Sequence, residues 1–541
     1  MPPFADTLLR MNRRILVLEV VLVAACCAFL FFYGLGSFGL VGADEPRYAQ
    51  IAREMLERRD WVTPVLYREP WLEKPILYYW RAMIAYSIFG VSDWAARLPS
   101  TTFAAFMVVF TYFWTWKFRR SARLDAALML AASAIMVGFS RAASTDMQLA
   151  APFTVAMLCW FGWYRTEHRA WLAFFYLFSA LGMLAKGPVA PFLAGVIVAA
   201  FALVMRDTRL IRRTLWIPGI LIFLAVAIPW YVAVQMANPQ FMRIFIFEHN
   251  LARFGTNMFR HKQPFWYFLP VVLIAVMPWT VLVIAGVVEA VRNLRDRLRR
   301  VATDTDGLTV FLLLWAVIPV VFFSISQSKL PGYILPAIPP FLLLGALYMS
   351  RQVENSEGPP IWLIAAHASL VAVILAVLFI APAQMMRAPA PVQATMLAAL
   401  VGTVTFLTLA ISILRHGYPM LRTATVVAVV LGVAFILRGM PRVIDATQSE
   451  RMVAAAAKAV APDVRTVATF KAKREVEYGV AFYRNQPVPV YERLEIPEGE
   501  HLVISRIGSE GELREILPGR VIKRVDEFPP QRLEFFLVGP K

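Results

Sequence analysis

A dense cluster of charged side chains follows the first long apolar run of this chain, in "GADEPRYAQIAREML" (residues 42–56). Within it, Asp44 stands two residues before Pro46, which restrains the backbone beside the apolar run. A carboxylate at the edge of a membrane costs free energy and is usually kept for a function. It can orient a substrate, act as a general base, or stabilise positive charge in a transition state. The cluster therefore indicates chemistry at a membrane surface.

Other polar or aromatic side chains stand at the ends of further apolar runs. They are Glu73 and Lys74 in "PWLEKP" (70–75), Asp146 in "RAASTD" (141–146), Lys186 in "AKGP" (185–188), His249 and His261 in "FEHNLARFGTNMFRHKQPFWYF" (247–268), and Lys329 and Tyr333 in "SQSKLPGYILP" (326–336). Several cations and a few acids on one side of a membrane favour chemistry on an anionic substrate.

Each of these residues, taken singly, also has a structural interpretation. Lysines at the ends of spans usually extend their charged heads to the membrane surface, which would account for Lys74, Lys186 or Lys329. Asp146 opens an apolar run and is predicted to be its helix N-cap. Histidines at an interface more often form hydrogen bonds than bind a metal. The set as a whole, rather than any member, favours a functional site.

Composition identifies the elements that must position these side chains. The chain has 541 residues, of which 59% are hydrophobic and 17% charged, against about 25% charged in soluble domains. Runs of about 17–25 apolar residues recur along most of its length, as in membrane-spanning helices. The first run, residues 15–32, is followed by no small-residue cleavage site and is predicted to be retained. We therefore predict a polytopic α-helical membrane protein.

The basic clusters predict the topology, because cytoplasmic loops collect Lys and Arg. Clusters near residues 10–14, 117–123, 165–169, 206–213 and 292–300 place the N-terminus inside and the C-terminus outside. About thirteen spans result, near 15–36, 100–116, 124–140, 147–164, 170–185, 189–205, 214–234, 267–290, 308–325, 333–350, 361–381, 393–414 and 421–438.

Two segments of the first external loop are predicted to be helices that do not span the membrane. The stretch 76–90 is short and contains an arginine. Counting it as a crossing would move the later basic loops outside, so we predict a re-entrant or juxtamembrane helix, with a tilted crossing as the alternative. Residues 44–56 are predicted to form an amphipathic helix whose Tyr48, Ile51 and Met55 face the membrane while its charges face water.

The end of the chain differs in composition from the rest. "TVATFKAKREVEYGVAFYRNQPVPVYERLE" (466–495) alternates short β-rich runs with a helix-like segment and proline turns. A tail of about 100 residues suits a small soluble α/β domain. We therefore predict a transmembrane catalytic domain with external loops over residues 1–440 and a soluble external α/β domain over residues 441–541.

Charge and cysteine content argue against several classes of protein. The net charge of +18 comes without a basic stretch interleaved with aromatics, which argues against nucleic-acid binding. The three cysteines, Cys26, Cys27 and Cys159, lie in apolar runs and predict neither a disulfide framework nor a thiolate metal cluster. A flippase or an ion pathway would need polar residues in a line through the spans, and the sequence does not have them.

The motifs together resemble a known family. "DEPRYAQIAREML", "LEKP", the Asp146 turn, "AKGP", "EHNLARF…HKQPFWYF" and "SKLPGYIL" occur in the same order as in the bacterial aminoarabinose transferases that modify lipid A. These are membrane glycosyltransferases of the GT-C class, similar to protein O-mannosyltransferases. The resemblance implies a multi-pass protein of the bacterial inner membrane with its active site and C-terminal domain on the periplasmic side.

The resemblance also implies substrates and residue roles. The donor would be 4-amino-4-deoxy-L-arabinose linked to undecaprenyl phosphate and the acceptor a phosphate of lipid A, and the product would confer resistance to polymyxin and other cationic peptides. The implied roles are catalytic for Asp44 and Asp146, contact with the polyprenyl phosphate for Arg47, Tyr48, Lys74 and Tyr333, and zinc binding for Glu73 with His249 or His261. Trp71, Lys186 and Lys329 complete the predicted substrate-binding set. Trp71 stands where relatives often have tyrosine, so a hydroxyl contact to the donor is expected to be absent.

The predicted reaction needs the leaving phosphate to be neutralised, which Lys and Arg side chains do electrostatically. An acceptor phosphate is already anionic, so Asp44 is expected to orient the sugar or to stabilise charge at its anomeric carbon. A hydroxyl acceptor would instead require Asp44 as a general base. The alternative function is therefore a protein O-mannosyltransferase-like enzyme with another sugar or a hydroxyl acceptor, and a lipid flippase is the more distant one.

Overall fold

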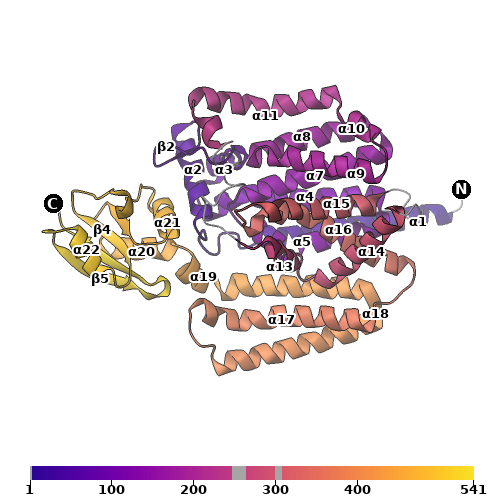
Figure 1. Cartoon of the computed structure of the whole chain (residues 1–541). Helices are drawn as coiled ribbons and strands as arrows, with labels where there is room; N and C mark the ends of the chain where they lie inside the picture. Colours follow the sequence, from indigo (N-terminus) through magenta and orange to yellow (C-terminus); the bar gives the residue numbers. More distant parts are fainter. Residues whose placement is uncertain (1–2, 246–262, 299–306, 541) are drawn as a thin grey trace.

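The computed structural model describes residues 3–245, 263–298 and 307–540. Figure 1 shows a bundle of helices lying side by side, with a small sheet of C-terminal residues at one end. The first helix, α1 (Pro3–Cys27), begins at the opposite end of the bundle. The two ends of the chain therefore lie at opposite ends of the bundle, and their placement on opposite sides of a membrane stays a prediction.

Helices, most of them apolar, make up the bundle. They are α1 with its π-helical continuation η1 (Ala28–Phe32), α4 (Asp93–Phe118), α5 (Arg123–Ala131), α6 (Ala134–Ser140), α7 (Asp146–Thr166), α8 (Arg169–Lys186), α9 (Val189–Val204), α10 (Arg209–Thr214), α11 (Ile217–Ala237), α13 (Phe268–Ala275), α14 (Thr280–Leu298), α15 (Leu308–Ile325), η5 (Pro331–Ala337), α16 (Ile338–Glu354), α17 (Ile361–Met385) and α18 (Val392–Gly439). Among the described residues, six helices are long and apolar enough to span a membrane, or up to eight if each of two bent pairs forms one span. The chain is a multi-pass helical membrane protein.

The predicted spans fall on these helices. The segments 124–140 and 267–290 correspond to the bent pairs α5 with α6 and α13 with α14, which turn by 58° and 119°. The helix α18 contains two predicted spans, which Gly417 separates with a φ of +68° that favours glycine. Length and apolarity support six to eight spans in the described part of the chain, so the count of about thirteen stays a prediction.

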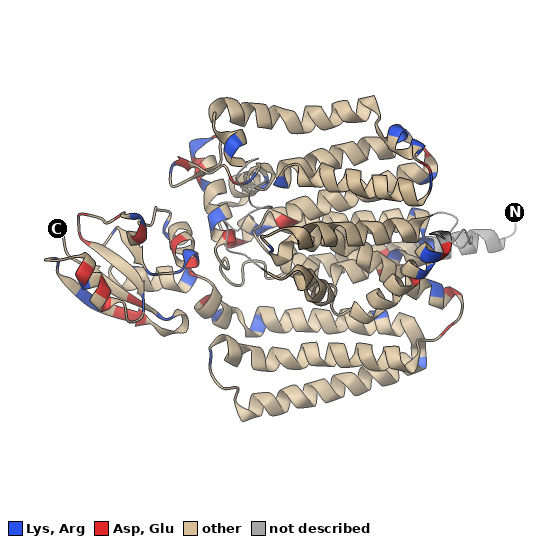
Figure 2. Cartoon of the chain, in the orientation of Figure 1, with Lys and Arg blue, Asp and Glu red and all other residues tan. Residues whose placement is uncertain are grey.

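Charged residues gather at the two ends of the bundle and in the C-terminal sheet (Figure 2). The middle parts of the long helices carry few charged residues in the same view. This distribution is expected for spanning helices, because an unpaired charge in the hydrocarbon core costs several kcal/mol, about 2.5–3.5 on insertion scales. The end of the bundle next to the sheet is one of these two charged ends.

Short elements at that end hold the first predicted motifs. They are α2 (Asp44–Arg58), the antiparallel strands β1 (Val65–Leu66) and β2 (Glu69–Pro70), and α3 (Leu77–Phe89). The helix α3 has 13 residues, so it is about 20 Å long and too short for a hydrocarbon core of about 30 Å. It is not among the candidate spans of the described residues. This favours the predicted juxtamembrane helix over a tilted crossing.

The prediction that one face of α2 meets the membrane is wrong. Tyr48, Ile51 and Met55 are buried in the main hydrophobic core, with at most 4% of their surface exposed. The helices α3 and α21 (Arg474–Arg484) pack against α2 and cover it. The apolar periodicity of α2 marks one face, as predicted, but that face is buried in protein and does not meet lipid.

The C-terminal segment forms a mixed sheet with four helices. The strands are β3 (Val467–Phe470), β4 (His501–Arg506), β5 (Ile522–Phe528) and β6 (Leu533–Val538), and the helices are α19 (Pro441–Gln448), α20 (Arg451–Val460), α21 and α22 (Glu510–Ile516). The strand order is β3-β4-β6-β5, with β3 parallel to β4 and β6 antiparallel to both neighbours. Alternate strand residues pack into two clusters, one on each face of the sheet. The predicted mixture of strands and helices is present in this segment.

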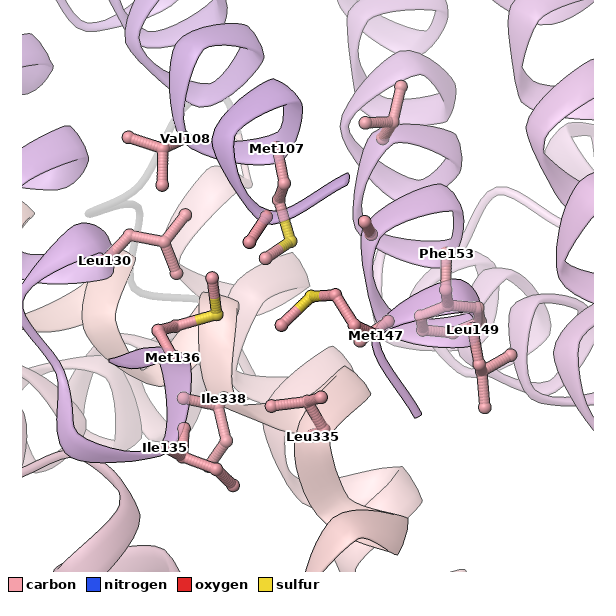
Figure 3. Packing of buried hydrophobic residues seen from close by; sticks show 14 of the residues in the cluster. Met107, Val108, Leu130, Ile135, Met136, Met147, Leu149, Phe153, Leu335 and Ile338 are labelled. Carbon is pink, nitrogen blue, oxygen red and sulfur yellow. The ribbon is translucent and has the colours of Figure 1, made fainter. Parts of the chain in front are cut away.

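Packed methionines hold the start of α7, next to Asp146. Figure 3 shows the side chains of Met107 on α4, Met136 on α6 and Met147 on α7 pointing toward one another among aliphatic residues. All three are fully buried. Methionine is unbranched and fills irregular gaps where helices meet. This contact fixes the first turn of α7 and with it the position of the adjacent carboxylate.

Candidate functional site

Asp44 is the first residue of α2 and forms an ion pair with Arg47. The distance from Arg47 Nη2 to Asp44 Oδ1 is 2.5 Å. Residues three positions apart lie on the same face of a helix, so this pairing follows from the local sequence. The Asp44 side chain is 57% exposed, whereas that of Arg47 is 9% exposed. The acid is therefore accessible to a substrate while a buried cation holds it in place.

Three aromatic rings surround the Arg47 guanidinium. Its central carbon lies 5.1 Å from the ring centroid of Tyr48, 5.3 Å from that of Trp71 and 5.4 Å from that of Tyr478, all within the range of cation–π attraction. Burial by itself would lower the pKa of Arg47, but the surrounding tyrosines and acids, among them Asp44, raise it above its ordinary value. The guanidinium therefore stays cationic although water has little access to it.

Trp71 takes part in this arrangement through its ring. Its indole Nε1 and the Nε of Arg47 are buried without a hydrogen-bond partner in the described part of the chain. Trp71 has no hydroxyl to offer a donor, and its ring instead forms a cation–π contact with Arg47. Glu73 and Lys74 follow in the next residues, both partly buried, and the charge of Glu73 helps to raise the pKa of Arg47.

A second group of residues surrounds Asp146, at the start of α7. Lys186, the last residue of α8, forms an ion pair with Asp146, and both side chains are less than 20% exposed. The Lys186 ammonium also lies 5.3 Å from the ring centroid of Tyr333 in η5. A Cβ added to Gly332 would meet Asp146 Oδ1 at 2.7 Å, so only glycine allows η5 to approach so closely. Three separate motifs thus meet at one carboxylate.

The prediction that Asp146 is a helix N-cap is wrong. Thr145 occupies the N-cap position of α7, and neither it nor Asp146 caps the helix through its side chain. The Asp146 carboxylate instead accepts hydrogen bonds from Lys186 and from Ser144. Because α8 packs next to the start of α7, Lys186 forms an ion pair with this carboxylate. The ion pair outweighs a local capping bond to a backbone N–H at the helix end.

Tyr48 connects the two groups. Burial raises the pKa of Tyr48, and the charges of Asp44 and Asp146 both raise it further. The buried Tyr48 hydroxyl is thus under the electrostatic influence of both carboxylates. The structure therefore brings the predicted acids of two distant motifs to one region.

Lys329 is buried, and its contacts are with backbone. Its ammonium donates to the carbonyl oxygen of Ser326 at 2.6 Å and to that of Gln263 at 3.0 Å. The side chain thus links the two loops at this end of the bundle. Its predicted role in substrate binding stays a prediction.

A buried ion pair that the sequence analysis did not single out positions both acids. Arg97 on α4 donates from Nη2 to Glu45 Oε2 at 2.8 Å, and its side chain is 1% exposed. Arg97 also donates to three carbonyl oxygens of the loop before α2, those of Leu35, Phe38 and Gly39. Glu45 Oε1 accepts from the backbone N–H of Ala143, three residues before Asp146, at 2.6 Å. The pair therefore joins the segments that carry Asp44 and Asp146.

The C-terminal helices support the same loop. Asp445 accepts a hydrogen bond from the backbone N–H of Gly39 at 2.6 Å, and the Tyr483 hydroxyl accepts one from that of Leu40 at 2.7 Å. Val41 forms an isolated β-bridge with Ser449. The C-terminal segment therefore holds the backbone that leads into Asp44 and also supplies Tyr478 to the ring around Arg47.

One signal in the sequence could have identified Arg97, and none identifies Tyr478. An arginine in an otherwise apolar helix is costly without a partner, so Arg97 in α4 could have been paired with an acid. The contact of Tyr478 with Arg47 joins residues 431 positions apart, and no local pattern reports a contact of that range.

The predicted metal ligands cannot be assembled from the described residues. His249 and His261 lie outside the described residues, and Glu73 is the remaining member of that set. Within the described ranges, no group of three or more His, Cys, Asp or Glu side chains lies close enough to hold a metal ion. A zinc site stays a prediction, and no step below depends on it.

Comparison with known proteins supports the same family. Residues 16–245 match the family model of dolichyl-phosphate-mannose-protein mannosyltransferases. The chain is 32% identical over 335 residues to the undecaprenyl phosphate-α-4-amino-4-deoxy-L-arabinose arabinosyl transferase of Yersinia enterocolitica, and 31% over 336 residues to that of Serratia proteamaculans. These alignments cover 60% and 61% of this chain and 58% of each relative.

A solved structure shows the same fold over nearly the whole chain. The crystal structure of ArnT from Cupriavidus metallidurans bound to undecaprenyl phosphate superimposes with a TM-score of 0.77 at 22% identity. The match covers 96% of this chain and 99% of that one. The resemblance to the aminoarabinose transferases is therefore confirmed in sequence, and the fold is theirs.

Proposed function

Starting from this resemblance, we propose that the chain is a membrane glycosyltransferase that uses a polyprenyl-phosphate sugar donor. In its specific form, the proposal is transfer of 4-amino-4-deoxy-L-arabinose from undecaprenyl phosphate to phosphate groups of lipid A, at the periplasmic face of the bacterial inner membrane. One observation carries the proposal. The motifs shared with these transferases bring Asp44, Arg47, Asp146, Lys186 and Tyr333 to one end of the helical bundle.

The cations of the site would neutralise the departing donor phosphate. Arg47 is held by Asp44 and by three rings before any substrate binds, so little reorganisation is needed when charge develops on the leaving group. Lys74 lies in the turn before α3 and would supply a second positive charge. Lys186 is paired with Asp146 and would orient an anionic substrate beside that carboxylate.

Asp44 would act on the sugar. Its carboxylate is more than half exposed, so it can approach the ammonium of an aminosugar or the positive charge that develops at the anomeric carbon. An acceptor phosphate attacks through an oxygen that is already anionic, so no base must remove a proton. With a hydroxyl acceptor, the same carboxylate would have to accept that proton. The match of residues 16–245 to protein mannosyltransferases favours this as the second candidate function.

Mass spectrometry of lipid A and of periplasmic glycoproteins distinguishes the two candidates. Cells that express the protein should carry lipid A with added aminopentose, and cells that express the Asp44→Asn variant at equal level should not. A sugar found on periplasmic proteins, with lipid A unchanged, would support the hydroxyl-acceptor transferase instead. If neither lipid A nor proteins changed, a transferase function of either kind would be excluded under those conditions.

The C-terminal tyrosine is expected to contribute to donor binding. Replacing Tyr478 by alanine removes one of the three rings around Arg47, and a cation–π contact is worth about 0.5–2 kcal/mol. The dissociation constant of undecaprenyl phosphate should rise about 2–30-fold, while Tyr478→Phe, which keeps the ring, should bind almost as well as the wild type. Binding is measured on purified protein in detergent.

Tyr491→Ala is the matched control for this prediction. Tyr491 is a buried tyrosine of the same segment with 4% exposure, but it belongs to the cluster on the other face of the sheet. The Tyr491→Ala variant should lose about as much thermal stability as Tyr478→Ala, but its affinity for undecaprenyl phosphate should equal that of the wild type. Equal affinities of the two alanine variants would show that Tyr478 acts only in folding.

A further inference from the structure

The helix α3 contains an arginine whose partners in the described part of the chain are all neutral. The helix has the sequence LYYWRAMIAYSIF, in which Arg81 is the one charged residue. Its Nη1 donates to Gln148 Oε1 on α7 and its Nη2 to Thr102 Oγ1 on α4, each at 2.5 Å. Its guanidinium carbon lies 3.4 Å from the ring centroid of Phe103. All of these partners are neutral.

The positive charge of Arg81 is therefore not compensated within the described part of the chain. Three other arginines of the helical bundle each pair with a carboxylate: Arg97 with Glu45, Arg123 with Glu19, and Arg422 with Asp125. Burial lowers the pKa of Arg81 to about 9, and no acidic group acts against this shift. The side chain is still cationic at pH 7, but it lacks the counter-charge that a partly buried cation normally has.

The helix faces around Arg81 carry exposed apolar side chains. Residues one and two turns further along α3 on the same face, Ile84 and Ile88, are 49% and 66% exposed. Along α4, Phe106 and Phe113 follow Thr102 at helical spacing and are 41% and 42% exposed. Exposed apolar side chains in a row on such helices are in contact with acyl chains in a membrane. Arg81 thus borders an exposed apolar surface that would face lipid in a membrane.

Arg81 has N–H groups that form no hydrogen bond within the described part of the chain. A guanidinium carries five N–H groups, and the hydrogen bonds to Gln148 and Thr102 use two of them. Both neutral partners hold the planar group in one orientation, which prepares it for a fork of hydrogen bonds to an oxyanion. The anion that reaches a lipid-facing surface near the membrane interface is the phosphate of a lipid headgroup.

We propose that Arg81 binds the phosphodiester of an anionic phospholipid, whose acyl chains lie along the exposed faces of α3 and α4. A single cation with neutral neighbours matches the single negative charge of a phosphodiester, whereas a doubly charged phosphomonoester is better matched by several cations. This proposal does not depend on the transferase function, because it rests on the charge and surroundings of Arg81 alone.

The bound lipid would be connected to the candidate site by hydrogen bonds. Gln148 lies two residues after Asp146, and its Nε2 donates to Ser100 Oγ at 3.4 Å. Ser100 Oγ in turn donates to the carbonyl oxygen of Ser144 at 3.3 Å. A phospholipid bound to Arg81 would therefore stabilise the loop before Asp146. Loss of the phospholipid would loosen that loop.

Native mass spectrometry of the purified full-length protein tests the proposal, with phosphatidylglycerol and phosphatidylcholine as probes. The wild type should retain phosphatidylglycerol in preference to phosphatidylcholine. Arg81→Gln removes the charge and should weaken phosphatidylglycerol binding about tenfold or more, as expected for loss of a charge-assisted hydrogen bond. Arg81→Lys should keep part of the binding, because the charge remains but the fork is lost.

Arg438→Gln is the matched control, because Arg438 is an exposed arginine of the bundle that also has a neutral partner, the Tyr33 hydroxyl. It should bind phosphatidylglycerol as the wild type does. Equal losses in Arg81→Gln and Arg438→Gln would mean non-specific attraction and would overturn the proposal, as would unchanged binding in Arg81→Gln.

Melting temperatures of all variants separate binding from folding. If Arg81→Gln does not fold, Thr102→Val serves in its place, since it removes the hydroxyl that orients the guanidinium while keeping the charge. That variant should bind phosphatidylglycerol more weakly than the wild type, and unchanged binding would count against the site. Transfer activity is not the readout, so a failure here leaves the proposed function standing.

Discussion

Asp44→Asn should reduce the rate of sugar transfer by about 10²–10³-fold, the effect of losing one preorganised electrostatic group. Asparagine keeps the oxygen that accepts from Arg47, so the local geometry should survive while the negative charge is lost. The Asp44 side chain is 57% exposed, so its neutralisation should not disturb the core. The measurement is the initial rate with purified protein and lipid-linked donor, at donor concentrations that separate kcat from KM.

Glu57→Gln is the control for this variant on the same helix. Glu57 also pairs with an arginine of α2, Arg53, and is 51% exposed, but it lies at the other end of the helix from Asp44. Its removal should leave the rate unchanged, and both variants should melt near the wild-type temperature. A well-folded Asp44→Asn protein with nearly normal kcat would remove Asp44 from the catalytic residues.

Arg97→Met should destabilise the protein by about 3–5 kcal/mol, the usual cost of breaking a buried ion pair by removing one partner. The substitution leaves Glu45 buried without its cation and removes the donors to three carbonyl oxygens. We expect a strongly lowered melting temperature in detergent and a loss of monodisperse protein in size-exclusion chromatography. Activity should fall as well, because the pair joins the segments of Asp44 and Asp146.

Arg451→Met provides the comparison at the same end of the molecule. Arg451 pairs with Asp93 and Asp445, but its side chain is 32% exposed, against 1% for Arg97. Water can replace part of the lost interaction there, so the loss of stability should be clearly smaller. If Arg97→Met melted no lower than Arg451→Met, the buried pair would not be a main support of the site.

Some features of the site follow from short stretches of sequence. Asp44 and Arg47 are three positions apart in one helix, and such a pair meets wherever the helix forms. The turns that end on Asp146 and Lys186 stand at the ends of apolar runs, so their placement near a membrane surface follows from composition. Order and spacing of these motifs were also enough to recognise the resemblance that the comparisons confirm.

Other features depend on how the helices pack. The predictions for Asp146 as an N-cap and for a lipid-facing side of α2 failed for one reason. In each case the contact comes from a part of the chain that is distant in sequence. The Asp146 carboxylate pairs with Lys186 instead of capping its own helix, and α21 instead of lipid covers α2.

The sequence by itself determined the membrane class, the helical segments, the mixed C-terminal segment and the motifs that carry charge, because each depends on composition or on spacing within a few residues. Only the tertiary structure decided which charges pair. Glu45 meets Arg97, Asp146 meets Lys186, and Arg47 meets Tyr478. Burying a charge without a partner costs free energy, and the helix that supplies the partner is set by the packing of the whole bundle rather than by neighbours in the chain.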